Sequence, residues 1–243
     1  MPFGVLINSA AIILGGTLGL FVKDKLKLEF KEKLNLIFGL CSMGMGVSSI
    51  VLMENMPAVV FSIIIGTALG LAVHLGERIR QGAGLMQRAV SRLLPSASRT
   101  LPEQEFTDTL VTVIVLFCAS GTGIYGSIVS GMTGDHSILI AKSILDLFTA
   151  LIFSCTLGAV VALIAVPQIV IFLALYLAAG LLYPMTTPDM IHDFMAAGGF
   201  IMLATGFRMI HLKMFPTADM IPAMVLVMPV SWFWSTWILP LLG

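Results

Sequence analysis

The stretch FCASGTGIYGSIVSGMTGDHSILIAKSILDLFTALIFSCT, residues 117–156, carries the most informative residues of the chain. Its first half is rich in glycine, and its second half is an apolar run interrupted by Lys142 and Asp146. Because helical residues four positions apart lie on one face, these two side chains can form an ion pair. We therefore expect a glycine-rich segment over 121–134, either a helix break or a close-packing stretch, followed by a helix with one charged pair.

The charged pair belongs to a wider polar stripe on that helix. At 100° per residue, one narrow sector contains Asp135, Lys142, Asp146, Thr149 and Thr156. An ionisable side chain inside a membrane costs about 3 kcal/mol or more on insertion scales, and it often marks a pathway or a proton relay. If the helix begins near residue 137, a rise of about 1.5 Å per residue puts Asp146 roughly 13 Å down, near the bilayer midplane.

The composition outside this stretch points to a membrane protein. The chain is 58% hydrophobic and 11% charged, whereas soluble domains are roughly 45–50% apolar and about 25% charged. So few charges cannot solvate the surface of a chain of 243 residues. The net charge is zero, so there is no electrostatic case for nucleic-acid binding. We expect an all-α, polytopic transmembrane helix bundle that forms a single membrane domain over residues 1–243.

Eight apolar segments are long enough to cross a bilayer as helices, for which about 20 residues are needed. Twelve of the thirteen Lys and Arg residues lie in loops that eight crossings would place on one side. The positive-inside rule then puts those loops in the cytoplasm and both termini outside. Trp232, Trp234 and Trp237 near the outer end of the last segment fit an interfacial aromatic belt. The segments cover approximately 3–22, 35–53, 57–75, 106–124, 137–164, 168–183, 191–210 and 219–241.

The segment 77–94, ERIRQGAGLMQRAVSRLL, is too charged to cross a membrane. Its apolar residues fall on one helical face, opposite Arg88 and Arg92, which predicts an amphipathic helix in the cytoplasmic interface. A helix docked on the protein itself would show the same pattern. Residues 96–102 are expected to form a linker to the next span.

Two pairs of segments resemble each other within the chain. IILGGTLGLFV (12–22) is similar to IIIGTALGLAV (63–73), and both carry the small-xxx-small spacing that lets helices approach closely. GLCSMGMG (39–46) is similar to GFIMLATG (199–206). An inverted repeat relating the first three spans to the last three would fit, as in many secondary transporters. Glycine-rich membrane helices also match each other by chance.

Other motifs carry less information. GTGIYG at 121–126 matches the dinucleotide fingerprint GxGxxG, but it lies at the end of an apolar helix rather than in a strand–helix unit, so we reject that interpretation. The three cysteines and four histidines lack metal-ligand spacing. No metal and no cofactor are therefore predicted. No set of residues has a readable catalytic spacing, so the chain is not predicted to be an enzyme.

Several of these segments together resemble a known family. FCASGTGIYGSI (117–128), GMTGDHS (131–137) and KSILD (142–146) form the specific block, and NSAAIILGGTLGL (8–20) and AAGGFIMLATG (196–206) fit the same pattern. The chain resembles the YdfK/YqgA-like uncharacterised bacterial inner-membrane proteins, the domain-of-unknown-function 554 family, over nearly its whole length. The resemblance implies a multi-pass protein of the bacterial cytoplasmic membrane. It transfers no functional residue.

We expect a transporter or channel for a small solute or ion, with Asp146 as the ion or proton site and Lys142 as its counter-charge or an anion contact. The alternative is a non-transporting structural or regulatory membrane protein whose charged pair only holds helices together. Expected partners are the lipid bilayer, the solute or ion, and a second copy bound through the small-xxx-small faces. The other residues of the candidate site are Ser143, Thr149, Gly121, Gly123 and Gly126.

Overall fold

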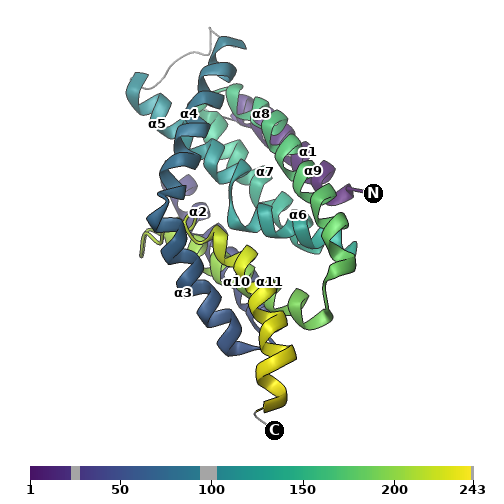
Figure 1. The fold of residues 1–243 in the computed structure, drawn as a ribbon. Helices are drawn as coiled ribbons and strands as arrows, with labels where there is room; N and C mark the ends of the chain where they lie inside the picture. Colours follow the sequence, from purple (N-terminus) through teal and green to yellow (C-terminus); the bar gives the residue numbers. More distant parts are fainter. Residues whose placement is uncertain (23–27, 94–102, 242–243) are drawn as a thin grey trace. The chain divides into compact units, whose positions relative to one another are not determined.

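The computed structural model describes residues 1–22, 28–93 and 103–241, and within these ranges it contains helices and no strand (Figure 1). The all-α prediction is confirmed. The helices are α1 (Phe3–Val22), α2 (Leu28–Ile50), α3 (Met56–Ala72), α4 (Leu75–Leu93), α5 (Glu103–Cys118), α6 (Gly121–Thr133), α7 (Ser137–Leu157), α8 (Val160–Leu163), α9 (Ala165–Leu182), α10 (Pro188–Met209) and α11 (Ile221–Phe233), with the short turns η1 (Tyr183–Met185), η2 (Trp234–Ile238) and η3 (Leu239–Leu241).

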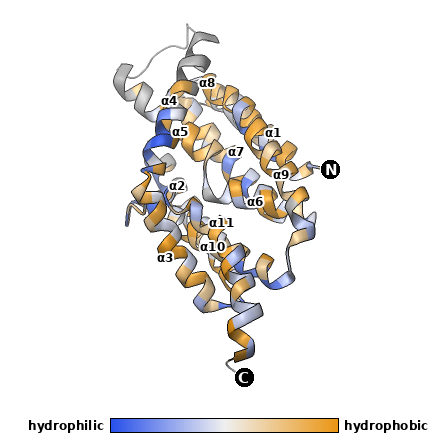
Figure 2. Cartoon of the chain, in the orientation of Figure 1, coloured by the Kyte–Doolittle hydropathy of each residue, from blue (hydrophilic) through white to orange (hydrophobic). Residues whose placement is uncertain are grey.

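Each predicted span has a counterpart in the structure, but the bounds of three differ clearly. The fourth continues to Thr133, and residues 160–164, which were predicted to end the fifth span, begin the sixth at Val160–Leu181. Among the described residues, seven segments are long and apolar enough to cross a membrane. The eighth is α3, whose 17 residues meet the same criteria only together with the start of α4. Figure 2 shows the difference in hydropathy between these helices: α1, α3 and α9 are mostly apolar, and the start of α4 is hydrophilic. The bundle of about eight spans is therefore confirmed as a fold class.

Two compact units make up the chain, and each combines two separate segments. Unit 1 contains Met1–Asn35 and Arg78–Gly180, and unit 2 contains Leu36–Glu77 and Leu181–Gly243. The first span thus lies in unit 1, while the second and third lie in unit 2. These units do not follow the proposed repeat of the first three and last three spans. The single membrane domain stays a prediction.

In unit 1, α1 packs along α7 through its small residues. A Cβ atom on Gly15 would collide with the backbone oxygen of Leu147, and one on Gly19 with the backbone oxygen of Leu151. Ser154 of α7 donates a hydrogen bond of 2.5 Å to the backbone oxygen of Gly16. Glycine lets the two backbones approach closely here. This contact sets the position of the polar side chains that α1 and α7 share.

In unit 2, glycines again lie at helix contacts. A Cβ on Gly66 or Gly70 of α3 would collide with the backbone of α11 or of the turn before it. In α2 and α10, Gly46 lies against Gly199, and Gly39 lies against Gly206, so the two similar segments found in the sequence cross in antiparallel directions. Both small-xxx-small faces are occupied within the chain. A homo-oligomer would have to use another surface.

The glycine-rich segment between α5 and α7 is more regular than expected. Residues 121–133 form α6, and the break before it comprises Ala119 and Ser120. Ser120 caps α6 by accepting a hydrogen bond of 3.2 Å from the backbone N–H of Gly123. Gly134 ends the helix with φ 75°, a conformation that glycine adopts without strain. Of the two alternatives for 121–134, a helix break or a close-packing stretch, the second holds for most of this range, because its glycines pack closely inside a helix.

The charged segment after α3 forms a helix, as predicted, since α4 covers Leu75–Leu93. It begins after a break at Val73 and His74, and His74 has a φ of 50°. The position of α4 in the membrane interface stays a prediction. The predicted linker at 96–102 and the basic residues Lys23, Lys25 and Lys27 lie outside the described residues.

Candidate functional site

The predicted ion pair forms inside unit 1. The ammonium nitrogen of Lys142 lies 2.8 Å from Oδ1 and 2.6 Å from Oδ2 of Asp146. Lys142 is 4% exposed and Asp146 is 5% exposed. Because α7 begins at Ser137 and has 21 residues, Asp146 lies near its middle. A charged pair with almost no solvent contact therefore lies halfway along a membrane-length helix.

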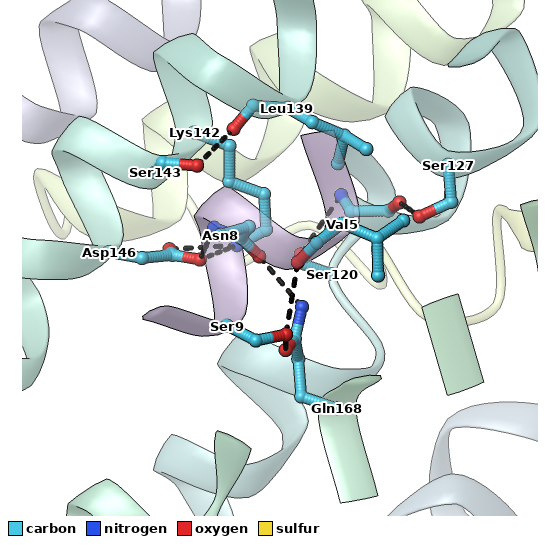
Figure 3. A network of polar contacts seen from close by, with 11 residues as sticks. Val5, Asn8, Ser9, Ser120, Ser127, Leu139, Lys142, Ser143, Asp146 and Gln168 are labelled. Carbon is cyan, nitrogen blue, oxygen red and sulfur yellow. Dashed lines mark hydrogen bonds and ion pairs between the residues drawn. The ribbon is translucent and has the colours of Figure 1, made fainter. Parts of the chain in front are cut away.

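A chain of neutral side chains leads away from this pair (Figure 3). Asn8 of α1 donates its Nδ2–H to Oδ2 of Asp146 at 2.8 Å. Gln168 of α9 donates its Nε2–H to Oδ1 of Asn8, also at 2.8 Å. Ser9 of α1 lies 2.6 Å from Oε1 of Gln168 and donates to it. We call Asn8, Gln168 and Ser9 the amide chain. All three residues are buried, and together with Asp146 they connect three helices.

An aromatic ring and a glycine lie beside the lysine side chain. The ammonium of Lys142 lies 6.0 Å from the centre of the Phe117 ring, within the range of a cation–π contact. A Cβ atom on Gly123 would collide with the Phe172 ring and come within 3.0 Å of the Cε atom of Lys142. Gly123 thus makes room for the lysine beside the first turn of α6. This explains one predicted site glycine by packing.

The remaining predicted site residues are Gly126, Thr149, Ser143 and Gly121. Gly126 packs against Ile138 and Leu139, and Thr149 is buried further along α7. Ser143 is buried but donates to the backbone oxygen of Leu139 in its own helix at 2.6 Å, away from the charged pair. Gly121 is the first residue of α6. The structure therefore brings together Lys142, Asp146 and Gly123, and gives Ser143 a bond within its helix.

Asp135 does not belong to the buried stripe, because it precedes α7 and is exposed. Its Oδ1 accepts a hydrogen bond of 2.6 Å from the hydroxyl of Ser137 and one of 2.8 Å from the backbone N–H of Ser137. These bonds stabilise the carboxylate and hold the pKa of Asp135 below its ordinary value. Asp135 therefore supports the start of α7 rather than the ion pair.

A second buried carboxylate, which sequence reasoning missed, lies in unit 2. Asp193 of α10 is fully buried and accepts from the backbone N–H groups of Glu54 and Asn55 at 2.9 Å each. It also accepts from the side-chain amide of Asn55 at 2.9 Å and from Ser231 of α11 at 2.6 Å. All four donors are neutral. The signal was available, since Asp193 is an ionisable residue inside the span predicted over 191–210.

Asp193 joins three parts of unit 2. Asn55 is the N-cap residue of α3, so the carboxylate lies at the N-terminus of that helix, where a negative charge is favourable. Beside it, His192 Nδ1 lies 3.1 Å from Glu54 on the exposed side. This arrangement ties the turn between α2 and α3 to α10 and α11. We interpret Asp193 as a structural anchor.

No group of three or more His, Cys, Asp and Glu residues in the described part of the chain could hold a metal ion. The hydroxyl of Ser130 lies 2.6 Å from Nδ1 of His136, but the described contacts add no carboxylate to that pair. In unit 1, a carboxylate, an ammonium group and two side-chain amides lie together. Such an arrangement can bind a small ion or exchange a proton. The chain is thus a polytopic helical membrane protein with a buried charged site.

Comparison with known proteins gives the family. Residues 3–232 match the family described as "Protein of unknown function (DUF554)", and the chain belongs to it. The chain is 44% identical to "Uncharacterized protein YqgA" of Escherichia coli (strain K12), over 98% of this chain and 99% of that protein. It is 24% identical to "Uncharacterized membrane protein YdfK" of Bacillus subtilis (strain 168), over 92% and 93% of the two chains. No solved structure matches the chain significantly.

Proposed function

We propose that the protein is an inner-membrane transporter or channel for a small solute or ion, in which Asp146 binds the ion or proton and Lys142 is its counter-charge. The observation that carries this proposal is the buried Lys142–Asp146 pair halfway along α7. Keeping charges in a membrane is costly, and intramembrane ionisable residues commonly belong to ion pathways or proton relays. The proposal assigns no catalytic reaction to the protein.

The polar surroundings of the pair support this function. A pair that only held helices together would need one partner on each helix, yet Lys142 and Asp146 both lie on α7. The link between helices is made by Asn8, which is neutral. Replacing a buried ion pair by well-packed apolar residues is often neutral or stabilising. The ion pair by itself bridges no two helices, and α1 and α7 also pack directly through Gly15 and Gly19.

A non-transporting structural role is the second candidate, and one observation favours it. Among the described residues, Thr67 has the single buried side-chain oxygen or nitrogen atom that lacks a hydrogen-bond partner. The atoms of the ion pair and the amide chain are therefore satisfied by protein groups. Such a network can hold α1, α7 and α9 in place without binding anything.

Reconstitution into liposomes tests the proposal. Purified protein is incorporated into vesicles that contain a pH-sensitive dye, and a panel of inorganic ions, organic anions and amino acids is added outside under a set membrane potential. We expect at least one solute or ion to produce uptake or a change in internal pH. Vesicles with the Lys142→Met, Asp146→Leu double variant should show none. Uptake at the wild-type rate by the double variant would exclude a role for the pair, and the structural role would then hold.

A further inference from the structure

The amide chain can run in two directions with nearly the same heavy-atom positions. At present it donates toward Asp146, from Ser9 through Gln168 and Asn8. A half-turn of a side-chain amide exchanges its N–H and C=O groups while keeping its shape. The hydroxyl of Ser9 also has a second acceptor, the backbone oxygen of Val5, at 3.0 Å (Figure 3). Each link can therefore exchange donor and acceptor.

We propose that Asp146 binds a proton and that this binding reverses the amide chain. The inference rests on the proposed function, because it names the ion that the site takes. A hydronium ion of the aqueous phase transfers a proton to Oδ2 of Asp146, so one O–H bond of hydronium breaks, one O–H bond of the carboxylic acid forms, and a water molecule is left. The new hydroxyl donates to Oδ1 of Asn8. Asn8 then donates to Gln168, Gln168 donates to Ser9, and Ser9 donates to the backbone oxygen of Val5.

The contacts of Asp146 favour a proton over a metal cation. In the described part of the chain, the donors to its oxygens are nitrogen atoms, namely the ammonium of Lys142 and the amide of Asn8. Hard cations require several oxygen ligands, and Lys142 already occupies the position between the two carboxylate oxygens. A proton needs one lone pair and one nearby acceptor, and the reversed amide of Asn8 provides that acceptor.

Proton binding changes the charge balance of the site. The pair goes from neutral to a charge of +1, and Lys142 loses its counter-ion. The bond between Asp146 and Asn8 changes from a charge-assisted to a neutral hydrogen bond, which is roughly half as strong. Among the described contacts, Cys118 of α5 is a further titratable side chain that interacts with both charges. The residues of α1 and α9 that face it, Asn8, Ser9 and Gln168, do not titrate.

Spectroscopy on the full chain tests this inference. The chain contains three asparagines and four glutamines, so amide side-chain labelling with ¹⁵N gives few NMR signals. We expect the signals of Asn8 and Gln168 to shift together as pH falls in lipid nanodiscs, while that of the exposed Gln81 on α4 stays constant. The variants Asn8→Ser and Gln168→Met each remove one side-chain amide signal, and the signal that is lost is assigned to the replaced residue. Infrared difference spectra should show the carbonyl band of a protonated carboxylic acid with the same midpoint, and this band should be lost in Asp146→Asn.

Two results would overturn the inference. An infrared spectrum without a band that depends on Asp146, at every pH where the protein stays folded, would exclude proton binding. A band without the joint shift of the Asn8 and Gln168 signals would exclude the reversal. The transport assay separates this inference from the proposed function. Transport without the spectroscopic signature would contradict only the inference, and the signature without transport of any tested solute or ion would contradict only the proposed function.

Discussion

The side chain of Asn55 donates a hydrogen bond of 2.9 Å to Asp193 across a sequence separation of 138 residues, and the same separation joins Asn8 to Asp146. Each unit therefore contains a buried aspartate that accepts from an asparagine earlier in the chain. The two sites differ in charge. Asp146 has a buried lysine beside it, whereas Asp193 is stabilised by four neutral donors. This difference leads us to assign ion binding to the first site and anchoring to the second.

Removing one partner of the Lys142–Asp146 pair should destabilise the protein by about 3–5 kcal/mol, because the remaining charge is buried without compensation. Lys142→Met and Asp146→Asn should each lower the unfolding midpoint in detergent. The double variant Lys142→Met, Asp146→Leu removes both charges and should recover most of the loss. Unchanged stability in Lys142→Met would show that the two residues are not paired in the membrane.

Replacing Asp193 should destabilise unit 2 without affecting the charged site. Asp193→Ala removes the acceptor of four hydrogen bonds, and each buried donor left alone costs about 1–3 kcal/mol. We expect a loss of at least about 3 kcal/mol, measured by chemical denaturation in detergent. Asp189→Ala, at an exposed position one turn earlier on α10, is the matched control and should change stability little. Equal effects of the two variants would contradict the anchoring role.

Glycines at helix contacts should tolerate no side chain. Gly66→Ala would place a methyl group into the backbone of Ala223, so we expect a clear loss of folded protein. Gly44→Ala is the control, because a Cβ there meets nothing within 4 Å. That change should be neutral or stabilising by up to about 1 kcal/mol, since alanine favours a helix more than glycine does. Fluorescence-detected size-exclusion chromatography at rising temperature measures both.

The start of α7 should depend on pH through Asp135. Its pKa is lowered in the folded protein from the ordinary 3.8, because Ser137 donates two hydrogen bonds to the carboxylate. A lowered folded pKa contributes stability that is present above 3.8 and is lost as pH falls through the folded value. Ser137→Ala should raise the pKa of Asp135, as measured by carboxyl NMR titration. An unchanged titration would show that the hydroxyl of Ser137 does not bind the carboxylate.

The orientation in the membrane follows from the basic residues. Reporter fusions at Gly243 should report the outer side, and fusions near Ser96 should report the cytoplasm, because the Lys and Arg residues cluster in alternate loops. Five of the eight predicted spans lie between these two fusion sites, so the sites must lie on opposite sides of the membrane. If both fusions reported the same side, one of the five predicted spans that follow Ser96 would not cross the membrane, and the eight-span topology would be wrong.

Local rules were sufficient for part of the candidate site. The spacing of Lys142 and Asp146 predicted their ion pair, because positions four apart on a helix are neighbours whatever surrounds them. The same rules failed for Asp135, since the exact start of α7 depends on how Asp135 and Ser137 bond to each other. For residues 121–133 they left a helix break and a close-packing stretch equally open, and only the packing of the glycines against neighbouring helices decides for the second.

Composition and the length of the apolar runs determined the membrane class, the helical fold and about eight spans, because each of these depends on the chain's own hydropathy rather than on contacts between distant residues. The partners of Asp146 could not be found in this way. Asn8 and Gln168 lie 138 and 22 residues from it and look like ordinary polar residues in apolar helices. Only the packing of α1 and α9 around α7 brings the amide of Asn8 to the carboxylate and the amide of Gln168 to Asn8. In unit 2, the neutral donors to Asp193 are likewise brought together by packing.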